Sequence, residues 1–127
     1  IDSLRAAGIR IGIVCDVGFT PSSVLRDHLI RTGLLPLFDH WSFSDEVGAY
    51  KPSPVIFEHA LEGLGGVTPE RVAHVGDLRR TDIAGARAMG MTAVRYTGVF
   101  DDDSASEPEG HLVVSAHVEL PAALGIA

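Results

Sequence analysis

The segment that most constrains the fold of this chain joins a short apolar strand to a helix. Residues 71–75 are predicted to form the strand, Gly76 follows it directly, and residues 83–89 are predicted to continue as the helix. This arrangement places Asp77 at the tip of the strand and Asp82 in the first turn of the helix. Open α/β sheets bind their ligands in the crevice beyond the strand ends, so both carboxylates are expected to face such a crevice.

Two converging carboxylates indicate a site for a hard divalent cation such as Mg²⁺, which takes oxygen ligands and usually keeps several waters. A purely local explanation of Asp77 and Asp82 is also open. One aspartate would then sit in a turn, and the other would be favoured by the dipole at the start of the helix. The segment alone does not decide between these alternatives, and the rest of the chain is needed.

The remaining chain alternates short apolar strands with helices. Residues 9–15 are β-branched and almost wholly apolar, which is typical of a strand buried on both faces in a parallel sheet. The other predicted strands are residues 41–44, 92–96 and 111–114. Two predicted helices start at the pairs Thr20-Pro21 and Ser53-Pro54, where a hydroxyl caps the helix and proline takes its first position. The first of these helices is expected to pack His28 in an apolar stripe.

This alternation predicts a doubly wound, Rossmann-like α/β fold with a parallel sheet of about five strands flanked by helices. We expect a single domain over residues 1–127. Residues 45–50 are predicted to form a polar loop, and residues 98–110 an exposed acidic loop. His74, near the end of a buried strand, is expected to be a hydrogen-bonded core histidine rather than a metal ligand.

Composition excludes several classes of function. Acidic residues outnumber basic ones 17 to 10, and the formal charge of −7 would repel a phosphate backbone, so we expect no nucleic-acid partner. The single cysteine, Cys15, excludes an internal disulfide framework and a cysteine-rich zinc site. No apolar run approaches the ~20 residues of a membrane span and no signal peptide is visible, which predicts a cytoplasmic protein without a membrane partner.

Polar residues follow three of the predicted strands at the same edge of the sheet. Cys15 and Asp16 follow the first strand, Lys51 opens the helix after the second, and Asp77 follows the third. A lysine, a metal-binding carboxylate and a turn with available N–H groups together suit a phosphoryl group. The lysine supplies positive charge, the metal offsets phosphate charge, and turn amides donate to an anion.

With these residues in place, the chain resembles the haloacid dehalogenase-like hydrolase superfamily, in its phosphoglycolate-phosphatase-like branch. The second motif of that family is similar to IRIGIVCDVG, residues 9–18. The third is similar to FSDEVGAYKPSPVIFEHAL, residues 43–61, and the fourth to HVGDLRRTDIAGARAMGM, residues 74–91. The three segments occur in the family's order and at fitting spacings.

The resemblance implies a Mg²⁺-dependent phosphatase that acts on a small phosphomonoester through an aspartyl-phosphate. It implies that Asp77 ligates the metal and that Asp82 supports this ligand and the lysine from behind. Lys51 would hold the nucleophilic carboxylate and the phosphate together. The substrate itself is not indicated, because in this family it is set largely by a cap domain.

The same resemblance assigns the phosphate to the first strand end. The Cys15 side chain and the backbone N–H groups of Asp16 and Val17 would contact phosphate oxygens. Two of these residues depart from the family pattern. Cys15 replaces a hydroxyl and is a weaker donor, and Asp16 stands where asparagine is common, which adds negative charge beside an anion. Cys15 also has a purely structural explanation, as a small buried residue at a strand end.

The family's first motif, a strand that ends in Asp-x-Asp and carries the nucleophile, has no counterpart before Cys15. Residues 99–104 resemble it superficially, and we assign them to the exposed acidic loop. We therefore expect the natural polypeptide to continue upstream, or another chain to complete the sheet, and expect residues 1–127 alone to be inactive. Two alternatives remain open: a catalytically inactive α/β module that binds partners, and a metal-independent dehalogenase.

Overall fold

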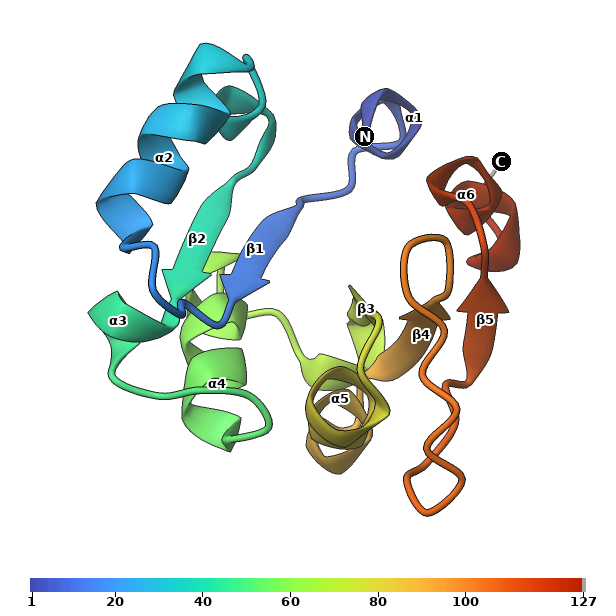
Figure 1. The fold of residues 1–127 in the computed structure, drawn as a ribbon. Coiled ribbons are helices and arrows are strands. Elements are labelled where there is room, and N and C mark those ends of the chain that lie inside the picture. The colour runs from blue at the N-terminus through green and yellow to red at the C-terminus, as the bar shows by residue number, and fades with distance from the viewer. Residues whose placement is uncertain (127) are drawn as a thin grey trace. The chain divides into compact units, whose positions relative to one another are not determined.

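The computed structural model describes residues 1–126. The chain divides into two compact units, Ile1–Gly66 and Val67–Ala127 (Figure 1). Within the described residues every pair of neighbouring strands is parallel. Strands and helices alternate in both units, which confirms the predicted α/β class with parallel strands. Compact units of this kind can belong to one domain, so the single-domain organisation stays a prediction.

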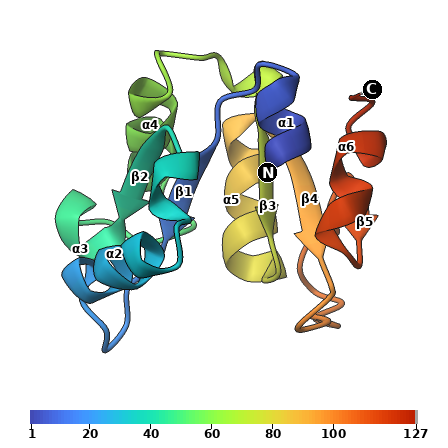
Figure 2. The same ribbon diagram turned by 90° about the horizontal axis from the view of Figure 1, so that it is seen from above.

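The first unit contains a two-stranded parallel sheet, β1–β2, between helices. Its elements are α1 (Asp2–Ala6), β1 (Gly12–Cys15), α2 (Ser22–Arg31), a 3-10 turn (Leu35–Leu37), β2 (His40–Phe43), α3 (Ser44–Val47) and α4 (Pro54–Gly63). In the register, Gly12 lies opposite His40 and Cys15 opposite Phe43. Helix α4 packs on both strands, and α2 lies on the other side of the pair (Figure 2).

Helix α4 follows the sequence prediction closely. The Ser53 hydroxyl accepts a hydrogen bond from the Val55 N–H at 3.3 Å, and Pro54 occupies the first helical position. One face of the helix is buried and consists of Ile56, Phe57, Ala60 and Leu61. Burial of this stripe supplies much of the apolar contact in the unit, because Ile56 and Phe57 are fully inaccessible.

Helix α2 departs from the prediction. It begins at Ser22 rather than at Pro21, and the residue that precedes it, Pro21, supplies no side-chain cap. The predicted apolar stripe is wrong at His28, which is exposed. The buried residue of this helix is Ser22, whose N–H donates to the Asp45 carboxylate at 3.0 Å and whose hydroxyl donates to Glu46 at 3.1 Å. The helix is thus held by polar contacts to α3, which occupies part of the predicted polar loop.

The second unit contains a three-stranded parallel sheet in the order β3–β4–β5. Its elements are a 3-10 turn (Pro69–Arg71), β3 (Ala73–Gly76), a π-helical turn (Arg79–Ile83), α5 (Ala84–Met89), β4 (Thr92–Tyr96), β5 (Leu112–Val114), a second 3-10 turn (His117–Glu119) and α6 (Leu120–Ala123). Helix α5 packs on β4 and α6 on β5. Strand β4 has the predicted bounds, whereas the other strands are shorter than or shifted from their predicted ranges.

The core of the second unit forms between β4 and the helix before it. Ile83, Ala86, Ala93 and Val94 are fully buried. Gly90 ends α5 in the left-handed conformation with φ of 83°, which glycine adopts without strain. Among the helices of residues 1–126, none has both the length and the apolar character needed to cross a bilayer.

Four of the described strands, β1, β2, β3 and β5, have one edge that no described strand occupies. Strand β1 pairs only with β2, and β3 pairs only with β4. Open edges of short apolar strands expose backbone N–H and C=O groups that another strand can pair with.

Candidate active site

In the first unit, a hydrogen bond connects the turn after β1 to the segment that precedes α4. Cys15 is the last residue of β1, and Asp16 follows it in the turn. The Asp16 carboxylate accepts a hydrogen bond from the backbone N–H of Lys51 at 2.9 Å, over a separation of 35 residues. The structure therefore brings Cys15, Asp16 and Lys51 to one place, as the sequence predicted for these three.

Cys15 is a neutral thiol in this setting. Burial raises the pKa of the Cys15 thiol, and the positive charge of Lys51 offsets only part of that increase. The sulfur donates weakly to the carbonyl oxygen of Asp16 at 3.7 Å. A protonated, half-buried thiol is a poor nucleophile, and the role of Cys15 as a contact to a bound group stays a prediction.

Val17 was expected to offer its N–H group to a phosphate, and the structure gives this group an internal acceptor. The Val17 N–H donates to the Ser44 hydroxyl at 2.7 Å, and both residues are buried. Ser44 is the first residue of α3, so the bond fixes the turn after β1 to that helix. A phosphate contact at Val17 would require this N–H to exchange one acceptor for another.

Asp82 is an interior carboxylate in the second unit, with both oxygens engaged. The residue is 3% exposed and lies in the π-helical turn. One oxygen lies 2.9 Å from Nε2 of His74, and the other accepts the Leu78 N–H at 3.2 Å. This agrees with the expectation that His74 is a hydrogen-bonded core histidine. The engaged oxygens suit the predicted supporting role of Asp82 better than direct metal ligation.

The close approach of Asp82 to the strand end depends on Gly76. A Cβ atom at position 76 would lie 2.1 Å from the Cγ atom of Asp82. Real Cβ atoms do not come so near to another carbon, so the space that glycine leaves is filled by the carboxylate. The glycine in this motif is thus a packing requirement rather than a conformational one.

Asp77, unlike Asp82, is not held by hydrogen bonds to its side chain within the described residues. It follows β3 directly, is half-buried, and its carboxylate makes no hydrogen bond within residues 1–126. A carboxylate without an internal partner at the carboxyl end of a parallel strand is available to a ligand. The two aspartates of the motif therefore differ: Asp82 is fixed in the interior and Asp77 is available.

The described residues fit one part of a Mg²⁺ site. Within residues 1–126 no three His, Cys, Asp or Glu side chains gather into a group that could hold a metal. Mg²⁺ is commonly bound through one or two carboxylates, with waters or substrate phosphates in the other positions. Asp77 suits such a role as one ligand, and further protein ligands would have to come from other residues.

The acidic segment after β4 is the largely exposed loop that we predicted, with one exception. Asp102 is only 6% exposed and accepts the Arg79 N–H at 2.7 Å. Arg95 of β4, also 6% exposed, pairs with Asp101 at 2.5 Å and with Glu109 at 2.7 Å. These hydrogen bonds raise the pKa of the Arg95 guanidinium above its already high value. The exposure prediction is therefore wrong at Asp102, which accepts the Arg79 N–H, whereas Asp101 and Glu109 pair with Arg95 and stay exposed.

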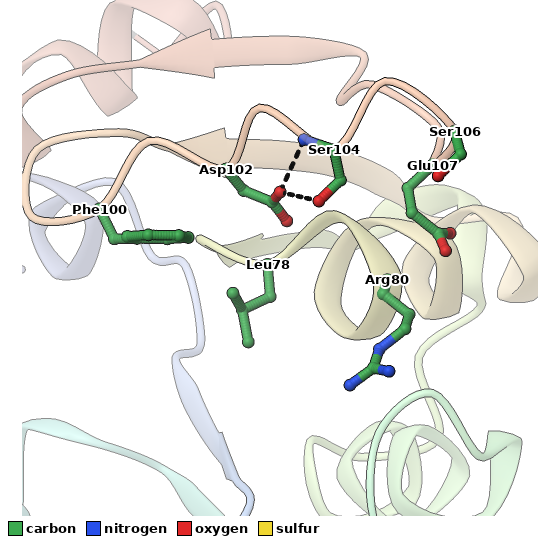
Figure 3. Close-up of a pocket in the computed structure, with 7 residues that line it drawn as sticks. All are labelled: Leu78, Arg80, Phe100, Asp102, Ser104, Ser106 and Glu107. Atoms are coloured by element: carbon green, nitrogen blue, oxygen red, sulfur yellow. Dashed lines mark hydrogen bonds between the residues drawn. The ribbon is translucent and has the colours of Figure 1, made fainter.

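A pocket of about 310 Å³ lies between the turn after β3 and the acidic segment (Figure 3). Its lining comes from these two segments alone, and consists of Leu78, Arg80, Phe100, Asp102, Ser104, Ser106 and Glu107. Figure 3 shows the Asp102 carboxylate hydrogen-bonded to the N–H and hydroxyl groups of Ser104. Sequence reasoning missed this feature, because the run of three aspartates from position 101 looked like a solvated loop.

The chain belongs to the haloacid dehalogenase-like hydrolase family, whose model matches residues 1–90. It is 41% identical over 91 residues to a glyceraldehyde 3-phosphate phosphatase of Methanothermobacter thermautotrophicus, covering 72% of this chain and 38% of that protein. It is 39% identical over 101 residues to the pyrimidine 5'-nucleotidase YjjG of Escherichia coli, covering 80% of this chain and 42% of that protein.

A solved structure supports the same fold. The chain resembles a haloacid dehalogenase-like phosphatase from Thermococcus onnurineus with a TM-score of 0.83 and 35% identity, covering 98% of this chain and 54% of that one. This likeness confirms the Rossmann-like fold class. The chain spans less than half the length of the two curated relatives named above. The family model ends at Gly90, so the acidic segment lies outside the matched residues.

Proposed function

We propose that these residues form part of a Mg²⁺-dependent phosphatase that hydrolyses a small phosphomonoester through an aspartyl-phosphate. The observation that carries the proposal is the pair of aspartates after β3. Asp77 presents a carboxylate with no partner in the described chain, and Asp82 beside it is fixed by His74 and Leu78. The two curated relatives named above, which both act on phosphate esters according to their names, support the substrate class.

The nucleophilic aspartate of this reaction lies outside residues 1–127 in our proposal. We call the natural polypeptide or assembly that supplies it the intact protein. A carboxylate oxygen attacks phosphorus and displaces the alcohol oxygen, which takes up a proton. Water then attacks the phosphorus of the acyl phosphate, which releases inorganic phosphate and restores the carboxylate. Mg²⁺, when bound, would offset the negative charge of the phosphoryl group.

The described residues have positioning and charge-stabilising roles in this scheme. Lys51 would orient the nucleophilic carboxylate and the phosphate through its positive charge. The Cys15 thiol and the Asp16 N–H would donate to phosphate oxygens. Asp77 would contribute a carboxylate to the metal, and Asp82 would keep the segment that carries Asp77 in place.

The direct test is an activity assay of the intact protein on a panel of small phosphomonoesters. We expect inorganic phosphate to be released, chelation with EDTA to stop the release, and added Mg²⁺ to restore it. Halide release from a haloacid in the presence of EDTA would instead identify a dehalogenase. Binding of phosphorylated compounds without turnover would identify an inactive binding module, and both outcomes would contradict the proposal.

A second prediction concerns the negative charge at Asp16. Replacing Asp16 with asparagine keeps a carbonyl acceptor for the Lys51 N–H and removes one negative charge beside the proposed phosphate position. We expect the inhibition constant of inorganic phosphate to fall about three- to tenfold, which corresponds to roughly one unit-charge repulsion in a solvated site. The measurement is competitive inhibition of the intact protein by phosphate.

The matched control is Asp27→Asn, which removes the same charge from an exposed position of α2. It is expected to leave the inhibition constant unchanged. If Asp16→Asn has no more effect than this control, the turn after β1 does not contact the phosphate.

A further inference from the structure

The segment that carries Asp77 is held from two sides by carboxylates. Asp77 makes no hydrogen bond of its own within residues 1–126, so its position depends on the backbone around it. The next two backbone N–H groups both donate to buried acids. Leu78 donates to Asp82 at 3.2 Å, and Arg79 donates to Asp102 at 2.7 Å. The first acid belongs to the family motif, and the second comes from a segment beyond the matched residues.

Asp102 is itself firmly placed. One oxygen accepts the Arg79 N–H, and the other accepts both the N–H of Ser104, at 3.0 Å, and its hydroxyl group. The hydrogen bonds from the Ser104 hydroxyl and the Arg79 N–H lower the pKa of Asp102 to about 2. The side chain is therefore an ionised acceptor at neutral pH, and an ionised acceptor makes a stronger hydrogen bond than a neutral one.

The segment that carries Asp102 is anchored on both sides of that residue. Asp101 pairs with Arg95 at 2.5 Å, and Glu109 accepts from the same guanidinium at 2.7 and 3.0 Å. Arg79 reaches the segment as well, because its guanidinium donates to Glu109 at 2.7 Å. A loop attached at Asp101 and Glu109 cannot easily withdraw the carboxylate that lies between these two points.

We propose that Asp102 is a positioning residue for the metal ligand Asp77, acting through the backbone N–H of Arg79. This inference rests on the proposed function, since it gives Asp77 its role as a ligand. It adds a residue that lies 25 positions after Asp77 and beyond residues 1–90, which the family model matches. Loss of the acceptor leaves a backbone N–H without its partner and frees the turn immediately after the ligand.

The test compares Asp102→Ala with Asp103→Ala in the intact protein. Asp103 is the exposed neighbour, and it makes no hydrogen bond within the described chain, so it controls for the loss of one charge. We expect Asp102→Ala to raise the dissociation constant for Mg²⁺, measured by calorimetry with MgCl₂, by about tenfold or more, as for other residues that orient a ligand. Hydrogen exchange of the amides in residues 78–83 is expected to accelerate, and Asp103→Ala should change neither quantity.

Kinetics separate positioning from direct catalysis. In Asp102→Ala a saturating concentration of Mg²⁺ should restore the parent kcat, because the ligand itself is still present. If the alanine variant does not fold, Ser104→Ala removes one of the groups that hold Asp102, and it should shift exchange and affinity in the same direction by less. An unchanged affinity, or a weaker affinity without faster exchange, would overturn the inference. Absence of any Mg²⁺ binding by the parent protein would instead refute the proposed function, and the inference with it.

Discussion

Replacement of Asp77 with alanine in the intact protein is expected to lower kcat/KM for a phosphomonoester about 10²- to 10³-fold, the usual effect of removing one charge-stabilising group. The physical reason is that Asp77 is the available carboxylate after β3, whereas Asp82 has both oxygens engaged. Stability should hardly change. A half-buried side chain that makes no hydrogen bond within the described chain leaves no partner behind, so the free energy of unfolding should stay within about 0.5 kcal/mol of the parent value.

This combination of results distinguishes a ligand from a structural residue. Steady-state kinetics and urea denaturation of the same preparation provide both measurements. Asp103→Ala is again the matched control, and it should retain activity and stability. A variant at Asp77 that keeps full activity would show that the metal, or the whole reaction, does not use this carboxylate. A large loss of stability would show that Asp77 has a structural partner in the intact protein.

The second large effect is expected from Gly76→Ala. The added Cβ would lie 2.1 Å from Cγ and 2.4 Å from Oδ1 of Asp82, so the carboxylate has to move. Its movement would break the partly buried hydrogen bonds from His74 and from the Leu78 N–H. We expect a cost of about 2–4 kcal/mol in the free energy of unfolding, from overpacking together with lost hydrogen bonds of the partly buried Asp82 contacts. Activity should fall too if Asp82 supports the segment of Asp77, as the proposed function has it.

Gly18→Ala is the matched control for this substitution. No atom lies within 4 Å of a Cβ built at position 18, and its backbone requires no left-handed conformation. Its free energy of unfolding should change by no more than about 0.5 kcal/mol. If urea denaturation gives Gly76→Ala the same midpoint as the parent, the interior position of Asp82 is not fixed against the strand, and its supporting role is refuted.

Local patterns explain why much of the fold could be predicted from the sequence. The Ser53-Pro54 start of α4, its buried stripe and the bounds of β4 all depend on neighbouring residues, which periodicity and capping describe well. The helix α2 shows where this reasoning fails. The spacing of its apolar residues suggested a buried stripe through His28. The residue of α2 that is buried is instead Ser22, which hydrogen-bonds to acids of α3 more than 20 positions away. Side-chain hydrogen bonds of that range leave no periodic signal.

The candidate site was likewise predicted only in part. Asp77, Asp82 and His74 lie in one short motif, and the strand–turn–helix pattern placed Asp77 at the strand end and Asp82 in the first turn of the helix. The different roles proposed for the two aspartates came from the family resemblance, not from this pattern. Asp102 could not be recognised, because its buried position depends on the Arg79 N–H, 23 positions before it. The loop that carries it is anchored through Asp101 and Glu109 to Arg95, a charged residue buried in a central strand. Arginine is rarely so buried unless it is paired, and the identity of its partners is a property of the folded chain. The acids of residues 101–109 therefore looked like a solvated surface.

The hydrogen bonds that anchor the acidic segment at Asp101 and Glu109 leave its parts with different tolerance to inserted residues. Asp101 and Glu109 fix the ends on Arg95, and Asp102 to Ser104 form a closed hydrogen-bonded turn. Between them, residues 105–108 carry no such bond to the sheet and are mostly exposed. Surface loops usually accept added residues anywhere along their length. In this chain an insertion, an affinity tag or a reporter should be tolerated after Ala105 and harmful a few positions earlier.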